Sequence, residues 1–398
     1  MNSSFLRVAL VLGLLSAVGP FATDMYLPAL PDIGRSLGAT TAQVQASLMA
    51  FFIAMGAGQL VYGPVSDMVG RKLPLYFGLA LFAAGSVGCA LSGDIGTLVA
   101  FRFLQGLGAC AGVVVPRAVV RDLHTGHDAA RLMALLMLVF SVSPILAPLA
   151  GSVMTEWFGW RSIFWAIVVL ALAGLALVAF GLQETRPAAQ RTKTSLASVL
   201  TGYGVLLRDR HFLGLILIGA FGVSSFFTYL ANAPFVLIDH FGLTPRQFGI
   251  AFSVNAASFI GCAQLTGRLS KRMGLGPLVQ RAVAGFAITM VLLVLLRLAG
   301  VDRLFVLLAL LFIGFGFLGL VMPTTAVLAL DRHGRIAGTA SALMGTTQFL
   351  VGAAVMALVG RFVDGSSRPM VVGIGLCAAS AFLLSRLTLG RRQRPRRP

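Results

Sequence analysis

Long apolar segments follow one another along almost the whole chain, separated by short polar connections. A membrane-spanning helix needs about 20 mainly apolar residues, and the chain is 58% hydrophobic and only 11% charged. Twelve segments have the required length: residues 5–31, 41–62, 73–92, 97–117, 130–153, 161–182, 211–237, 246–267, 277–298, 303–330, 336–358 and 369–389. The sequence therefore predicts an all-α integral membrane protein with twelve transmembrane helices, and little is left for a soluble domain.

The basic residues predict the orientation in the membrane. The chain has a formal charge of +18, and most of its 31 Lys and Arg residues fall in connections that share one side. Because basic loops stay in the cytoplasm, we expect both termini there. The basic tail 391–398 is predicted to contact anionic lipid. Nucleic-acid binding is not expected, since a basic face needs a fold to present it.

The longest polar stretch, from Gln183 to Arg210, divides the predicted spans six and six. It predicts four parts: an N-terminal six-helix bundle over 1–185, a cytoplasmic linker over 186–210, a C-terminal six-helix bundle over 211–390 and the basic tail. Residues 267–274 follow the eighth span as residues 63–70 follow the second, with both glycines and a serine in register. This echo indicates an internal duplication.

Residues 63–72 are predicted to form a short loop between the second and third spans. Gly63 and Gly70 allow close approach and backbone angles that other residues resist, while Asp67 and the pair Arg71 and Lys72 place opposite charges at the membrane surface. The positive-inside rule alone would explain the two basic residues but neither the acid nor the glycine spacing. We therefore predict a conformational latch here.

This stretch resembles the loop signature of the major facilitator superfamily, although Met68 replaces one of its basic residues. Two further signatures match in the fourth and fifth spans, at Arg102, Gln105 and Gly106 and at Pro144, Pro148 and Gly151. The run Asp24-Met25-Tyr26-Leu27-Pro28 narrows the resemblance to the bicyclomycin and chloramphenicol resistance (Bcr/CflA) subfamily of drug:proton antiporters. This resemblance implies two pseudo-symmetric six-helix halves, a bacterial inner-membrane location and alternating access.

The resemblance also predicts where the latch closes. In the superfamily, the start of the eleventh helix is expected near the acid of the loop signature, which is Asp67 here. A helix N-terminus carries partial positive charge and stabilises an acid. Arg117, at the inner end of the fourth predicted span, is expected to be the second partner of Asp67.

Two charged side chains lie inside predicted spans. Of the 13 acidic residues only Asp24 is clearly placed there, and a carboxylate at that depth is costly unless it faces water, has a partner or takes up a proton. We interpret Asp24 as a proton-coupling residue; alternatively, it caps an early break before Pro28. Arg102 stays charged and needs a partner, so it either tunes Asp24 or serves as a structural hydrogen-bond centre.

The sequence favours transport over catalysis. The five His residues lack metal-ligand spacing and the four Cys residues lie singly in apolar runs, so no enzyme, metal site or cofactor is predicted. We predict a proton-coupled multidrug antiporter that exports small amphipathic compounds and works as a monomer in the lipid bilayer. The alternatives are an exporter of an endogenous sugar or metabolite and a non-transporting membrane sensor. The candidate substrate-binding residues are Tyr26, Phe227, Tyr229, Asn232 and Asn255.

Overall fold

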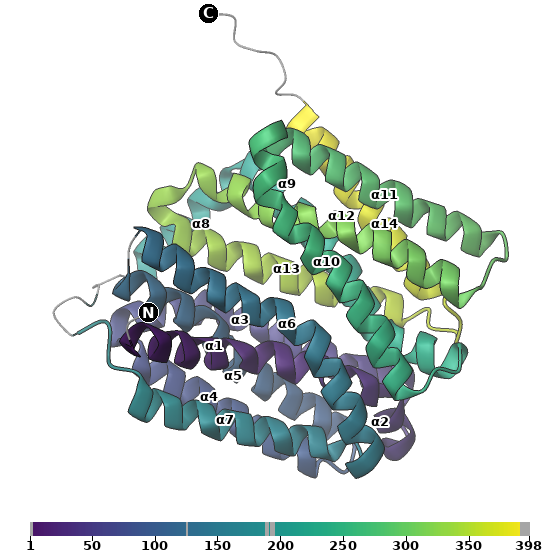
Figure 1. The fold of residues 1–398 in the computed structure, drawn as a ribbon, viewed down its shortest axis with the longest axis horizontal. Coiled ribbons are helices and arrows are strands. Elements are labelled where there is room, and N and C mark those ends of the chain that lie inside the picture. Colours follow the sequence, from purple (N-terminus) through teal and green to yellow (C-terminus); the bar gives the residue numbers. More distant parts are fainter. Residues whose placement is uncertain (1–2, 125, 188–190, 192–195, 391–398) are drawn as a thin grey trace, which may run out of the picture. The chain divides into compact units, whose positions relative to one another are not determined.

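The computed structural model describes residues 3–124, 126–187, 191 and 196–390, and all regular secondary structure within them is helical (Figure 1). Twelve helical segments in this part of the chain are long and apolar enough to cross a membrane. The predicted fold class is therefore confirmed. The basic tail 391–398 lies outside the described residues, so its contact with lipid stays a prediction.

Packing divides the chain into unit 1, Met1–Val199, and unit 2, Leu200–Pro398, and the division falls inside the predicted linker 186–210. Unit 1 contains α1 (Ser3–Asp24), η1 (Leu27–Ala29), α2 (Leu30–Leu37), α3 (Thr41–Val69), α4 (Lys72–Leu91), α5 (Ile95–Leu123), α6 (Gly126–Phe158) and α7 (Arg161–Gly181).

Helix α8 (Leu196–Arg208) crosses the division and leads into unit 2. The remaining helices are α9 (Arg210–Pro234), η3 (Phe235–His240), α10 (Pro245–Met273), α11 (Leu275–Leu298), α12 (Leu304–Asp331), η4 (Gly334–Ile336), α13 (Ala337–Gly360) and α14 (Arg368–Leu389). The linker predicted from polar composition thus includes a helix that the sequence analysis did not predict.

The two units repeat one pattern of helix pairing. In unit 1, α1 packs on α6, α3 on α5, and α4 on both α5 and α7; in unit 2, α9 packs on α13, α10 on α12, and α11 on both α12 and α14. Helices α3 and α10 also begin alike, at the capping boxes of Thr40 with Gln43 and of Thr244 with Gln247. The pairing and the caps agree with the predicted duplication.

The predicted loop 63–72 is mostly helix, because α3 runs to Val69 and α4 begins at Lys72. Pro64 does not end α3, since its ring fixes a helical φ and removes only one backbone hydrogen bond. A Cβ on Gly63 would meet no atom within 4 Å, so this glycine is not required for a close approach. The turn itself is confined to Gly70 and Arg71.

The first span, predicted as one helix to residue 31, is broken at Asp24. Helix α1 ends there, and η1 and α2 complete the span. Pro28 has no amide hydrogen, so the Asp24 carbonyl loses the bond that would continue the helix, and Pro31 does the same to Leu27. The Leu27 carbonyl accepts from the N–H of Leu30 instead, which produces a tighter 3-10 turn.

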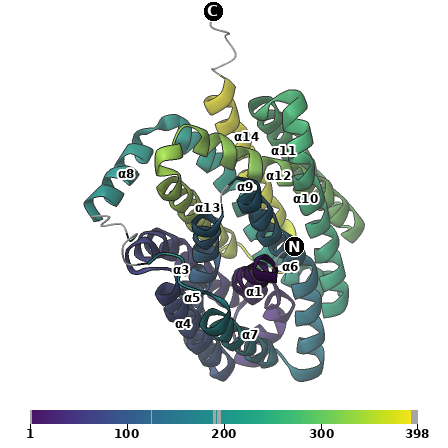
Figure 2. The ribbon, with the colours of Figure 1, turned by 60° about the vertical axis from the view of Figure 1, so that its left-hand side comes forward.

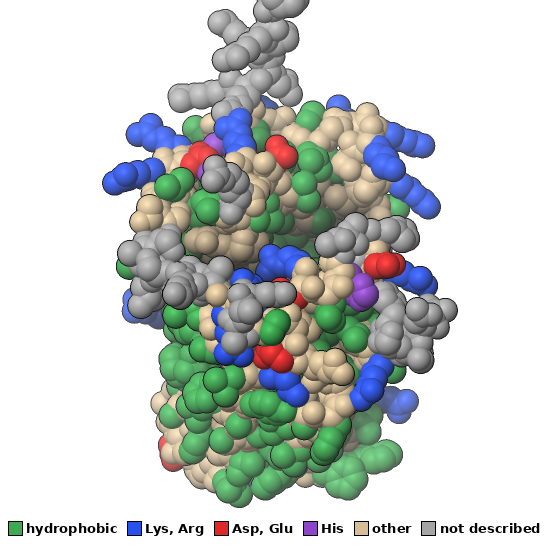
Figure 3. Space-filling view, turned by 90° about the vertical axis from the view of Figure 1, so that its left-hand side faces the viewer, with side chains coloured by type: hydrophobic (Ala, Val, Ile, Leu, Met, Phe, Trp, Pro, Cys, Tyr) green, Lys and Arg blue, Asp and Glu red, His purple; other side chains and the backbone are tan. Residues whose placement is uncertain are grey.

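The surface agrees with a membrane location. Large hydrophobic side chains such as Phe77, Phe180, Ile288 and Phe305 are more than 60% exposed on the long helices. Figure 3 shows one face, on which hydrophobic side chains cover much of the surface and Lys and Arg gather in groups. Apolar surface of this extent requires a cover, which lipid hydrocarbon supplies.

Candidate functional site

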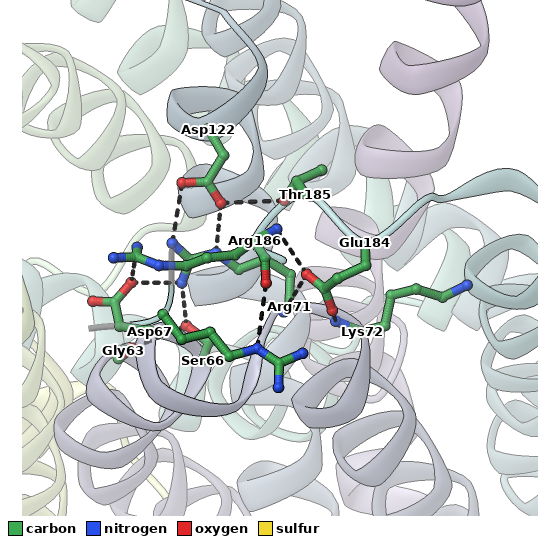
Figure 4. A network of polar contacts seen from close by, with 10 residues as sticks. Gly63, Ser66, Asp67, Arg71, Lys72, Asp122, Glu184, Thr185 and Arg186 are labelled. Carbon is green, nitrogen blue, oxygen red and sulfur yellow. Dashed lines mark hydrogen bonds and ion pairs between the residues drawn. The ribbon is translucent and has the colours of Figure 1, made fainter. Parts of the chain in front are cut away.

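A charged network at one end of unit 1 joins α3, the α3–α4 turn, α5 and the segment after α7 (Figure 4). At its centre, Arg71 donates from Nε and Nη2 to the two carboxylate oxygens of Asp122, at 2.7 and 3.1 Å. Its Nη1 donates to Ser66 Oγ at 2.8 Å and pairs with Asp67 Oδ1 at 2.7 Å. This matches the planar fork of donors that arginine offers to carboxylates.

The protonation of Arg71 follows from these contacts. Burial alone would lower the pKa of its guanidinium, but hydrogen bonds and charge from Asp122 and Asp67 raise the pKa above its usual value. Arg71 therefore stays charged. Removing one carboxylate from a buried pair is costly, because the other charge remains without compensation.

Asp67 does not pair with Arg117, which corrects the prediction from sequence. Its carboxylate pairs with Arg71 and, at 2.7 Å, with Arg186 from the segment after α7. Helix α5 continues to Leu123, so Arg117 lies inside the helix, with its guanidinium 5.5 Å from the ring of Phe140. The helix was predicted to end at Arg117, and its two further turns remove that residue from the network.

Glu184 holds the turn between α3 and α4. Its carboxylate accepts from the backbone N–H groups of Arg71 (2.9 Å), Lys72 (3.1 Å) and Arg186 (3.0 Å). Burial would raise the pKa of Glu184, but these three donors and nearby Arg191 hold it below its usual value. The ionised carboxylate thus lies at the N-terminus of α4, where the helix dipole favours a negative charge.

Gly70 is required beside this carboxylate for two reasons. Its φ is +97°, which other residues rarely adopt. A Cβ on Gly70 would also lie 2.6 Å from Glu184 Oε2. The prediction that Gly70 permits an unusual backbone angle and a close approach is therefore confirmed.

Five members of the network were not predicted: Ser66, Asp122, Glu184, Thr185 and Arg186. The sequence does contain a signal for the two acids: each follows the end of a predicted span and has basic residues close by in the sequence. Thr185 strengthens the assembly by donating from Oγ1 to Asp122 Oδ2 at 3.2 Å. The segment 184–186 is thereby fixed to the ends of α3 and α5.

Asp24 lies at the break of the first span, as the last residue of α1. It is only 7% exposed, and its carboxylate has no hydrogen-bond or ion-pair partner among the residues that the structure describes. The C-terminal end of a helix carries partial negative charge, which disfavours a second negative charge. An ionised carboxylate is therefore costly at this position, and a neutral one less so.

Arg102 binds the end of α1 two residues before Asp24. Its Nη1 donates to the carbonyl of Ala22 at 3.2 Å and to Gln105 Oε1 at 2.5 Å, and the side chain is fully buried. Gln105 in turn donates to Ser86 Oγ at 2.7 Å. Arg102 thus satisfies a carbonyl in the last turn of α1.

The rest of the Arg102 guanidinium contacts aromatic rings. Its central carbon lies 4.4 Å from the ring centroids of Tyr26 and Phe51, close enough for cation–π attraction. Nε and Nη2 are buried without a hydrogen-bond partner. No ion pair joins Arg102 to Asp24 within the described part of unit 1, so the two predicted coupling residues share the end of α1 without direct contact.

The signature glycines of α5 and α6 allow close packing around the break in the first span. A Cβ on Gly106 would collide with the Phe51 carbonyl, so this glycine allows α3 and α5 to approach closely. A Cβ on Gly151 of α6 would collide with the Met25 carbonyl. Pro148 and Pro144 lie about one and two turns earlier in α6, within a continuous helix. Helix α6 therefore packs directly on the residue that follows Asp24.

The predicted substrate-binding residues are buried inside their own units. Tyr26 is fully buried, with its hydroxyl 2.7 Å from Ser47 Oγ. Tyr229 is 1% exposed, stacks on Phe252 and accepts from Asn255 Nδ2 at 3.1 Å. These side chains are thus held by contacts with other protein residues.

The other two substrate candidates are also occupied by protein contacts. Phe227 stacks on Phe349 with ring centroids 5.5 Å apart, and Asn232 Nδ2 donates to the Thr228 carbonyl at 2.8 Å. The roles of all five candidates in binding substrate stay predictions. No group of three or more His, Cys, Asp or Glu side chains that could hold a metal occurs within the described ranges.

Comparison with known proteins connects this geometry to a family. A sequence model of the Major Facilitator Superfamily matches residues 12–357. The chain is 38% identical over 358 residues to the MFS-type transporter YdgK of Bacillus subtilis, covering 89% of each chain. It is 30% identical over 386 residues to a bicyclomycin resistance protein homolog of Haemophilus influenzae, covering 96% of each.

The fold is also similar to solved structures. The xylose transporter XylE from E. coli, in a partially occluded inward-open conformation, matches with a TM-score of 0.75 over 98% of each chain. The sequences are 16% identical, so this likeness concerns the fold alone.

Proposed function

The chain belongs to the Major Facilitator Superfamily of membrane transporters, and on that basis we propose that it is a proton-coupled antiporter that exports small amphipathic compounds, antibiotics among them, by alternating access. The resemblance predicted from the loop and helix signatures is confirmed at the level of the family. The name of the Haemophilus relative, a bicyclomycin resistance protein homolog, supports an antibiotic as cargo.

The observation that carries the proposal is the carboxyl group of Asp24. It lies at a break in a membrane span, is 7% exposed and has no partner among the described residues. A charge inside a span costs several kcal/mol without a partner or water, so this group favours the proton-bound form whenever water withdraws. It can release the proton when water or a cation reaches it.

Arg102 is the cation that we propose for proton release from Asp24. Its Nη1 holds Ala22, two residues from Asp24, while Nε and Nη2 are free of hydrogen bonds. The broken span lacks regular helical bonds at Pro28 and Pro31, and we propose that its rearrangement brings carboxylate and guanidinium together. Proton release from Asp24 would then favour one conformation over the other.

The charged network around Arg71 has a different role in this proposal. It fixes the ends of α3 and α5 to the segment that leads into the linker. We propose that it acts as the conformational latch, with the termini and the linker on the cytoplasmic side of a bacterial inner membrane.

The test compares two aspartates that lie eight residues apart. Asp24→Asn keeps the shape of the side chain but cannot titrate. Asp32→Asn changes a half-exposed residue of α2 whose carboxylate lies 3.9 Å from Arg35. We expect drug-induced proton release from the purified protein to be lost in Asp24→Asn and unchanged in Asp32→Asn. Undiminished release from Asp24→Asn would refute the coupling role.

The cargo needs its own experiment. Minimum inhibitory concentrations for a drug panel, measured in a pump-deficient host with and without the protein, should rise for at least one amphipathic antibiotic. If none rises while the wild-type protein still releases protons on addition of a sugar or metabolite, the alternative of an endogenous cargo replaces the drug.

A further inference from the structure

Helix α8 leads directly into a helix that is a candidate membrane span. A single residue, Asp209, separates its last residue from α9, which is the start of a candidate span. The Asp209 carboxylate accepts from the N–H groups of His211 (2.8 Å) and Phe212 (3.2 Å), and it pairs with His333 at 3.0 Å. These bonds fix Asp209 at the start of α9, and the Asp209 N–H donates to the Leu206 carbonyl of α8 at 3.2 Å. The corner between the two helices is therefore held from both sides.

The C-terminal part of α8 packs on unit 2 (Figure 2). Leu206 is fully buried in a cluster with residues of α9, α12 and α13, among them Phe212, Ala329 and Ala340. A Cβ on Gly202 would lie 3.4 Å from Thr339, so this glycine also faces α13. Leu206 and Gly202 thus mark the side of α8 that contacts unit 2.

Two large hydrophobic side chains of α8 are exposed along one stripe of the helix. Leu200 is 67% exposed and Leu207 is 54% exposed, and their spacing of seven residues places them on one stripe of the helix, with Tyr203 between them. The Tyr203 hydroxyl is buried with no hydrogen-bond partner in the described structure. Val205, which is 52% exposed, lies on the opposite edge, because two residues turn the helix by about 200°.

Exposed arginines gather where α8 ends. Arg208 closes α8 and Arg210 opens α9, and both are exposed. Arg332 is exposed beside His333, which pairs with Asp209 at the same corner. None of the three arginines forms an ion pair with a described residue.

We propose that the stripe of Leu200 and Leu207, together with Arg208, Arg210 and Arg332, docks on anionic phospholipid of the leaflet that faces the linker. The leucines enter the boundary of the acyl chains, and the arginines bind the phosphate groups. The occupant is lipid because the corner at Asp209 fixes α8 at the end of a membrane span. An anionic headgroup complements three arginines that lack carboxylate partners. This surface is independent of the proposed cargo.

The experiment uses the full chain in nanodiscs and measures quenching of a new tryptophan by brominated lipid. Leu207→Trp reports on the apolar edge, and Val205→Trp is its matched control, being similarly exposed on the same helix. The signal of native Trp157, Trp160 and Trp165 is subtracted with the unsubstituted protein. In discs of dibromo-phosphatidylglycerol, we expect at least threefold stronger quenching at position 207 than at position 205.

Headgroup recognition is tested by mixing lipids. In discs of equal phosphatidylglycerol and phosphatidylcholine, brominating only the anionic lipid should quench Leu207→Trp more strongly than brominating only the neutral one. The double change Arg208→Gln and Arg332→Gln should reduce this preference by about tenfold or more, at roughly fivefold per arginine. The pair Arg208→Lys and Arg332→Lys should retain it, since the charge is kept.

Two results would overturn the proposal. Equal quenching at positions 205 and 207 would mean that α8 has no lipid-facing edge. Equal quenching of Leu207→Trp by the two brominated lipids would mean that the arginines do not select an anionic headgroup. Size-exclusion profiles of each variant confirm that the protein is folded before the comparison.

Discussion

Replacing Gly70 by alanine tests the structure of the charged network. The residue has φ +97° and ψ 173°, a region that is essentially restricted to glycine and costs other residues of order 1–3 kcal/mol. The added Cβ would lie 2.6 Å from Glu184 Oε2 and 2.9 Å from its Cδ. These distances are too short, so the carboxylate must move away.

The cost of moving Glu184 follows from its contacts. Its carboxylate would lose or lengthen hydrogen bonds to the backbone N–H groups of Arg71, Lys72 and Arg186. Bonds to a charged group are worth about 1.5–3 kcal/mol when protected. Because Glu184 is partly exposed, solvent screening reduces the three together to about 1–2 kcal/mol. With the backbone strain, Gly70→Ala should lower the free energy of unfolding by about 2–5 kcal/mol.

The matched control is the other glycine of the same stretch. Gly63 lies inside α3 with no atom within 4 Å of an added Cβ, so Gly63→Ala should be neutral or stabilise by about 0.5–1 kcal/mol. Thermal unfolding in detergent at one fixed scan rate provides the comparison, because membrane proteins commonly unfold irreversibly. Gly70→Ala should melt several degrees below Gly63→Ala.

A double variant separates the two contributions. In the background of Glu184→Ala, the change Gly70→Ala should cost only the backbone part, about 1–3 kcal/mol, because the clash has been removed. Equal melting temperatures for Gly70→Ala and Gly63→Ala would refute the reasoning. A cost of Gly70→Ala that is the same with and without Glu184 would refute the part assigned to the carboxylate.

Two further predictions concern the arginine centres. Arg102→Lys keeps the charge but loses the planar fork of donors and its contact with two rings. Transport should therefore slow by about tenfold or more, and the pH dependence of transport should change. A wild-type rate and pH dependence in the proton-release assay would mean that charge alone suffices. Asp67→Asn should shift the conformational equilibrium by about twofold to fivefold toward the inward-open state. The change is modest because the Asp67 side chain is 42% exposed and Arg71 still pairs with Asp122 in the variant. Spin-label distances between the two units measure that shift, and unchanged distances with lost transport would contradict the latch.

The fold could be predicted from the sequence because its main signal is local. Each span is a continuous apolar run, and the length of such a run decides whether it crosses a membrane. The duplication was visible in residues 63–70 and 267–274 for the same reason. Helix α8 was missed because its 13 residues lie in a stretch that is polar on average, and its apolar stripe is shorter than any membrane span.

The candidate site could be predicted only where its members are neighbours in sequence. Asp67 and Arg71 are one helical turn apart, and they do form an ion pair. Asp122 and Glu184 reach the same arginine from other segments of the chain, and those contacts depend on where α5 and α7 end. The wrong partner, Arg117, came from ending α5 two turns early.

The two buried arginines of unit 1 differ in a way that residue type could not reveal. Arg71 and Arg102 are 3% and 0% exposed, yet Arg71 has carboxylates on two sides. Arg102 instead donates to a carbonyl and a side-chain amide, and its Nε and Nη2 atoms have no hydrogen-bond partner. An unsatisfied donor in a protein interior costs about 1–3 kcal/mol. An acceptor for Nε or Nη2 of Arg102 would remove that cost, whereas Arg71 already has carboxylate acceptors. The two arginines thus differ in their acceptors, although both are buried and charged, and this difference depends on contacts between segments that are distant in sequence.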